Sequence, residues 1–305
     1  MRPAFSVVFL TTLIGAGQGL FLALFAGLVG NAPDRFLIAG SAVSILLAAL
    51  GLLASFFHLG RPERAWRSAA MWRTSWLSRE VIVLPAFIAA TFGFGVATFY
   101  GSGFAFVLAV VALACCLALF YCTAMIYACI KFLQEWASPF TIANFFLMGA
   151  ASGFTLAAAM AALFAQQAVV AYCVTAIVLT LAALATRLAS LARNDRIRHK
   201  STLQTAIGVN HPKVRQVSQG FTVRSFNTEE FFHGQSPENM SRIRVSFLVL
   251  AFVAPMVALA VGSFTASFAI LALAFAIQYA GLVLERWYFL AQSNHPQNLY
   301  YQNKS

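Results

Sequence analysis

Eight long stretches of the sequence are almost entirely apolar, and each has about the length that an α-helix needs to cross a membrane. A crossing takes about 20 residues, because the helix rises about 1.5 Å per residue through the hydrocarbon core. The eight stretches are 4–29, 36–57, 81–99, 104–130, 140–164, 168–185, 245–261 and 264–284. They predict an all-α chain, a polytopic transmembrane bundle of eight helices that forms a single membrane domain over residues 1–305.

The charged residues support this prediction and indicate an orientation. Only 10% of the residues are charged, whereas a soluble domain carries about 25%. Of the 20 Lys and Arg residues, all but Arg35 belong to the N-terminus, the three long connections or the C-terminus, counted with the adjoining ends of the stretches. Positive residues favour the cytoplasmic side. We therefore expect a bacterial inner-membrane protein with both termini and all long loops in the cytoplasm, and no nucleic-acid partner.

Residues that hold redox metals are missing from the apolar stretches. Of the five histidines only His58 touches a stretch, so a haem with two histidine ligands in the membrane is not expected. The five cysteines show no C-x-x-C spacing and are interpreted as packing residues. The glycines at 15, 17 and 19 lie inside the first stretch and favour close helix packing over a nucleotide-binding loop. We predict no haem, iron–sulfur cluster or metal site in this chain.

The connection between the second and third stretches carries the main candidate site. His58 ends one stretch and Glu80 begins the next, so both lie at the same membrane face. An imidazole can hydrogen-bond a quinone oxygen and exchange a proton near neutral pH, and a carboxylate can relay protons to water. Trp66, Trp72 and Trp76 suit the membrane interface. The pattern predicts a quinone site; the alternative is that His58 caps one helix and Glu80 complements the dipole of the other.

Further polar segments have simpler interpretations. Gln18, Asn144, Gln278 and Glu285 lie within or beside the apolar stretches and are interpreted as interhelical hydrogen-bonding groups. The loop 193–241 mixes basic residues with phenylalanines and is too long for a plain tether. It is predicted to dock a soluble subunit in the cytoplasm, and contact with anionic membrane lipids is the alternative.

Two segments beside the candidate site resemble the DmsC family, the membrane anchors of dimethyl sulfoxide reductase-like complexes. They are H-L-G-R-P at 58–62 and S-W-L-S-R-E at 75–80, and the resemblance extends over the whole chain. It implies an anchor with no metal or haem of its own. Such an anchor holds an iron–sulfur electron-transfer subunit and a molybdopterin catalytic subunit at the membrane, and exchanges electrons with ubiquinone or menaquinone.

The resemblance also implies which residues meet the quinone. The quinol-site histidine and glutamate of the family fall on His58 and Glu80. Arg61, Arg64 and Ser78 lie between or beside them and are further quinone-binding candidates, expected to orient the head group or the carboxylate.

Parts of the long loop are more similar to one branch of the family. Segments 201–208 and 225–234 resemble the SoeC branch, which anchors cytoplasmic sulfite dehydrogenases. The resemblance favours a quinone-dependent sulfite dehydrogenase, in which sulfite is oxidised on the molybdenum subunit and quinone is reduced at this anchor. One alternative is an anchor that oxidises menaquinol for a dimethyl sulfoxide reductase. An alternative of another class is a secondary transporter, which should show midplane charges or broken helices.

Overall fold

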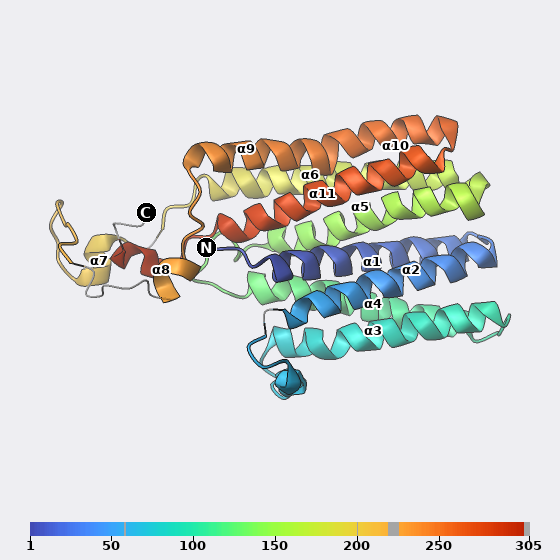
Figure 1. The fold of residues 1–305 in the computed structure, drawn as a ribbon, viewed down its shortest axis with the longest axis horizontal. Coiled ribbons are helices and arrows are strands. Elements are labelled where there is room, and N and C mark those ends of the chain that lie inside the picture. Colours follow the sequence, from blue (N-terminus) through green and yellow to red (C-terminus); the bar gives the residue numbers. More distant parts are fainter. Residues whose placement is uncertain (58, 200, 219–225, 302–305) are drawn as a thin grey trace.

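The computed structural model describes residues 1–57, 59–199, 201–218 and 226–301 and shows long helices packed side by side (Figure 1). Within these residues, eight helical spans are long and apolar enough to cross a membrane, which confirms the predicted all-α transmembrane bundle. They are α1 (Phe5–Val29), α2 (Asp34–Phe56), α3 (Trp76–Phe99), α4 (Ala105–Ala128), α5 (Pro139–Phe164), α6 (Val169–Asn194), the continuous run of α9 (Pro237–Leu248), η3 (Val249–Val253) and α10 (Ala254–Thr265), and α11 (Phe268–Ala291).

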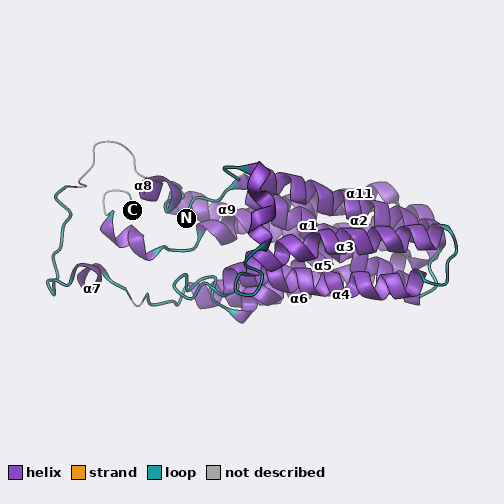
Figure 2. Cartoon of the chain, turned by 90° about the horizontal axis from the view of Figure 1, so that it is seen from below, coloured by secondary structure: helices purple, strands orange, loops and turns teal. Residues whose placement is uncertain are grey.

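The two ends of the bundle differ. Both termini and the long connections gather at one end, called the loop end below, and the short connections lie at the other (Figure 1). The loop end also carries four short helices, which are η1 (Pro62–Ala69), α7 (Leu203–Ile207), α8 (Phe226–Glu230) and η4 (Pro296–Tyr300). The short connection before α6 contains η2 (Gln166–Ala168). In Figure 2, η1 runs across the axis of the long helices, as a helix lying along a membrane surface would.

Four helices extend five or more residues beyond the apolar stretches that predict them. The third begins at Trp76 rather than 81, the sixth continues to Asn194 rather than 185, the seventh begins at Pro237 rather than 245, and the eighth continues to Ala291 rather than 284. Hydropathy marks the part of a helix that lies in lipid, whereas side-chain caps set the ends. Ser75 and Ser236 provide such caps, because each hydroxyl accepts a hydrogen bond from a backbone N–H of the first helical turn.

The bundle consists of two four-helix halves that meet at α1 and α5 (Figure 1). Glycines line this contact: Gly15 and Gly19 of α1 face Gly149 and Gly153 of α5. A Cβ added at Gly19 would overlap the backbone of Gly149, and one added at Gly153 would overlap the backbone of Gly19. The glycine pairs therefore allow the two backbones to touch, as small residues do in other membrane helices. This confirms the prediction that the glycines of the first apolar stretch serve close helix packing.

The polar residues inside the spans form hydrogen bonds between helices, as the sequence predicts. The Gln18 amide donates to the Cys116 carbonyl oxygen at 2.9 Å. The Thr186 hydroxyl donates to the side-chain oxygen of Asn144 at 2.8 Å. Gln278 donates to the Thr180 hydroxyl at 3.2 Å. Glu285 forms ion pairs with Arg187 of α6 and with the adjacent Arg286.

Candidate functional site

Glu80 lies in the second turn of α3, close to the loop end of the bundle. The helix begins at Trp76 because the Ser75 hydroxyl accepts a hydrogen bond from the Ser78 backbone N–H at 3.3 Å. Only 5% of Glu80 is exposed, and the hydroxyl of Thr123 on α4 donates to its carboxylate oxygen Oε1. An ionisable side chain buried at membrane depth is costly and is characteristic of a functional site. The arrangement supplies one buried group that can exchange a proton.

Arg79 fixes the connection that leads into α3. Its guanidinium donates to the carbonyl oxygens of Trp72 and Arg73, both at 2.9 Å. The same group lies 4.1 Å from the ring centre of Trp76, which packs edge-on against Tyr121 of α4 at 5.3 Å between ring centres. These contacts hold the loop against α3 and α4 beside the buried carboxylate.

The predicted quinone-binding residues have different surroundings. His58 lies outside the described residues. Ser78 is buried, 3% exposed, and its backbone N–H takes part in the cap of α3. Arg61 and Arg64 are exposed at the beginning of η1, and in the described part of the chain neither contacts Glu80. The structure therefore joins Glu80 to Thr123 and leaves the two arginines at the surface.

Thr123, which is not among the site residues predicted from the sequence, borders a small cavity between the two halves of the bundle. The cavity measures about 20 Å³, enough for one water molecule. Its polar lining includes Thr11, Gln18 and Ser152 besides Thr123, and the Arg286 side chain closes another side. The sequence feature that indicates Thr123 as a site residue is its polar side chain within an otherwise apolar helix.

A buried cluster of three charged residues adjoins this cavity. Arg187 Nε lies 2.9 Å from Glu285 Oε1, and Arg286 Nη2 lies 3.6 Å from Glu285 Oε2. None of the three is more than 5% exposed. The Arg286 guanidinium also lies 3.7 Å from the ring centre of Phe145. By its position in the sequence Arg187 belongs to the basic connection after the sixth apolar stretch, whereas the structure places it within α6, where it pairs with Glu285 of α11.

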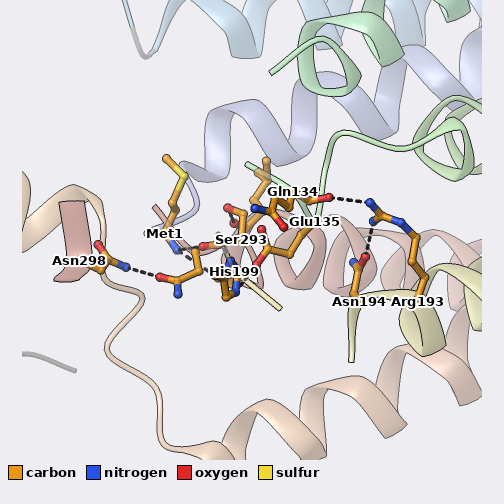
Figure 3. A network of polar contacts seen from close by, with 11 residues as sticks. Met1, Gln134, Glu135, Arg193, Asn194, His199, Ser293 and Asn298 are labelled. Atoms are coloured by element: carbon orange, nitrogen blue, oxygen red, sulfur yellow. Dashed lines mark hydrogen bonds and ion pairs between the residues drawn. The ribbon is translucent and has the colours of Figure 1, made fainter. Parts of the chain in front are cut away.

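Polar contacts at the loop end join segments that are distant in the sequence (Figure 3). They connect the N-terminus to the segment after α11, and the connection between α4 and α5 to the end of α6 and the loop that follows it. The contacts include Glu135–His199 at 3.5 Å, Arg193 to the Gln134 carbonyl oxygen at 3.0 Å, and the Met1 amine to the Ser293 carbonyl oxygen at 3.1 Å. The long loop therefore contacts the bundle at its beginning, through His199.

Two clefts lie in this loop-end surface. Their volumes are about 670 and 520 Å³, and both are lined by residues 232–235. Burial lowers the pKa of His233, which lines both clefts, so its imidazole favours the neutral form. Across the described residues, no group of three or more His, Cys, Asp or Glu side chains could hold a metal ion.

Comparisons with known proteins agree with these features. The family model described as DMSO reductase anchor subunit (DmsC) matches residues 1–301. The chain belongs to the DmsC family. This anchor is also 52% identical, over 323 aligned positions, to a subunit of the sulfite dehydrogenase of Allochromatium vinosum, with 99% of each chain covered. Membership confirms the resemblance carried by segments 58–62 and 75–80.

Family and fold together establish the general role. A DmsC-family chain with eight membrane-crossing helices is an integral membrane anchor subunit. The secondary transporter that composition alone leaves open is therefore excluded.

Proposed function

We propose that this chain is the quinone-reactive anchor of a sulfite dehydrogenase, and that it passes electrons between a partner iron–sulfur subunit and the quinone pool. The observation that carries the proposal is Glu80, a buried carboxyl group near the loop end, hydrogen-bonded to Thr123. The similarity to a sulfite dehydrogenase subunit over the full length of both chains supports the choice of complex.

The residues around Glu80 fit a quinone. A bound ubiquinone or menaquinone takes up two electrons and two protons when it is reduced to the quinol. Glu80 exchanges protons at its carboxylate, and His58 donates or accepts a hydrogen bond at a quinone oxygen. Arg61 and Arg64 lie on the loop that joins these two residues and orient the head group, and Ser78 positions the first turn of α3. The apolar tail remains between the helices in lipid.

The partners are an iron–sulfur electron-transfer subunit and a molybdopterin catalytic subunit. We propose that both dock at the loop end, on the predicted docking loop 193–241 and on the two clefts beside it. Sulfite is oxidised on the molybdenum subunit, and no substrate chemistry occurs in this chain. Membrane lipids surround the apolar faces, and the exposed Trp66 and Trp72 lie at their head groups.

The family description favours one further candidate. Because the matching model is that of DMSO reductase anchors, an anchor that oxidises menaquinol and delivers electrons to a reductase is the second possibility. The two candidates differ in the direction of electron flow and in the substrate of the partner.

Purification of the assembled complex tests the proposal. The tagged chain, extracted gently from membranes, should bring with it one subunit that holds iron and one that holds molybdenum. The complex should reduce a short-tailed ubiquinone when sulfite is added. It should not catalyse the oxidation of menaquinol by dimethyl sulfoxide. A chain that purifies without redox subunits contradicts the proposal. A complex that oxidises menaquinol with dimethyl sulfoxide, and ignores sulfite, supports the second candidate.

The orientation gives a separate prediction. Because basic residues gather at the loop end, we expect this end in the cytoplasm of a bacterium. Reporter domains fused after Gln235 and at the C-terminus should show cytoplasmic activity, and one fused after Asp34 should show periplasmic activity. A periplasmic signal after Gln235 would reverse the orientation and favour the reductase. A fusion after Gly101, which belongs to another short connection, serves as a control and should match that after Asp34.

A further inference from the structure

The cluster of Arg187, Glu285 and Arg286 contains one more positive charge than it needs for an ion pair. Two guanidinium groups share one carboxylate, and none of the three side chains is more than 5% exposed. A buried charge that has no counter-charge is strongly unfavourable. A structural ion pair would therefore contain one arginine, and the second arginine requires a partner elsewhere.

Arg286 is the arginine that faces the candidate site. Its Nε has no hydrogen-bond partner within the described part of the chain, and its side chain lines the water-sized cavity. Thr123 lines the same cavity and donates its hydroxyl hydrogen to Glu80. A water in the cavity can accept from Arg286 and donate to the Thr123 oxygen. Arg286 then donates to the water, the water donates to Thr123, and Thr123 donates to the Glu80 carboxylate.

Aromatic rings keep bulk water away from this path. Tyr127, one turn beyond Thr123 on α4, stacks on Phe145 with 5.4 Å between ring centres. Phe289 packs edge-on against both rings, at 5.5 and 5.7 Å. The Arg286 guanidinium lies over Phe145. In such a water-poor region, charges interact over longer distances than they do in solvent.

The charges balance when Glu80 is included. Among the described residues, Glu80 and Glu285 are the carboxyl groups buried within the membrane spans. With Glu80 ionised, two carboxylates match two guanidinium groups. With Glu80 protonated, one positive charge is left over.

We propose that Arg286 is a positioning residue of the quinone site, which stabilises the ionised form of Glu80 through the water-sized cavity and Thr123. This inference rests on the proposed role of Glu80 in quinone chemistry. The cluster determines the pH at which the carboxylate gives up its proton, and thereby the pH range in which the anchor works.

Few other ionisable groups face these residues. Cys122 and Tyr127 of α4 lie near Glu80, and Arg79 of α3 lies near Cys122. Tyr288 of α11 and Arg244 of α9 lie near the cluster. Helices α1, α5 and α10 contain no charged residue. His58 lies outside the described residues.

A series of charge variants tests the inference in the assembled complex. Arg286→Gln lowers the cluster charge by one and Glu285→Gln raises it by one. The midpoint of the pH profile of quinone-linked turnover should move up by about one pH unit in the first variant and down by about one in the second. Arg286→Lys keeps the charge and should stay close to the wild type. Gln278→Met removes a buried polar group of the same helix without changing charge, and should not move the midpoint.

Thr123 provides a second, milder test in case the charge variants do not assemble. Thr123→Val keeps the shape and every charge but removes the hydroxyl that links the cavity to Glu80. Its midpoint should move up, and Thr123→Ser should restore it. If Thr123→Val leaves the midpoint unchanged, or if Arg286→Gln and Glu285→Gln move it in the same direction, the cluster is purely structural. If Glu80→Gln leaves quinone turnover intact, the proposed function fails instead.

Discussion

Replacing Glu80 with glutamine should lower quinone-linked turnover by about 10²- to 10⁴-fold, the usual contribution of a general acid–base group. Glutamine keeps the volume of the side chain and can still accept the hydrogen bond from Thr123, so α3 and α4 should pack as before. What is lost is the ability to exchange a proton. Sulfite oxidation with an artificial soluble acceptor should be unchanged, because electrons then leave through the partner subunits.

Matched variants separate chemistry from structure in this experiment. Glu63→Gln removes an exposed carboxylate from η1 of the same loop and should leave both activities intact. His58→Ala should show the pattern of Glu80→Gln. A loss smaller than about threefold in both the His58 and Glu80 variants would place the quinone elsewhere, since it is well below the usual range. If both activities fell together and the partner subunits dissociated, helix capping and assembly would explain the two residues.

The sequence is sufficient to predict the eight helices because their signal is local. A transmembrane helix must satisfy its backbone hydrogen bonds within itself, so a long apolar stretch has few alternatives. The ends are less well determined. Helix α6 continues nine residues past its predicted end at 185, and the buried Arg187 near that boundary resembles a loop residue until its partner Glu285 is known.

The candidate site could be predicted only in part for the same reason. Glu80 stands out as an ionisable residue at the start of an apolar stretch. Thr123 is 43 positions away, and its contact with Glu80 depends on how α3 and α4 are rotated against each other. Arg187 and Glu285 are still further apart. Hydropathy contains no information about these rotations, so the cavity and the charge cluster become visible only in the folded chain.

The glycine contact between the two halves gives the second prediction with a large effect. A methyl group at Gly153 would overlap the backbone of Gly19, which cannot move without separating α1 from α5. These helices form the centre of the bundle, and 67% of an 18-residue apolar segment of each is buried. Gly153→Ala should therefore destabilise the protein by at least about 1–3 kcal/mol, the usual cost of overpacking a core. Gly153→Val should largely abolish accumulation in the membrane.

Gly93→Ala is the matched control for this prediction. A methyl group there would lie 3.6 Å from the Leu108 side chain, an ordinary contact. Alanine is also a better helix former than glycine by about 1 kcal/mol, and both substitutions receive this gain. Unfolding of the purified protein by a denaturing detergent should show Gly93→Ala at least as stable as the wild type and Gly153→Ala clearly less stable. Equal stability of the two variants would mean that α1 and α5 have room to separate, and that their glycines do not hold the halves together.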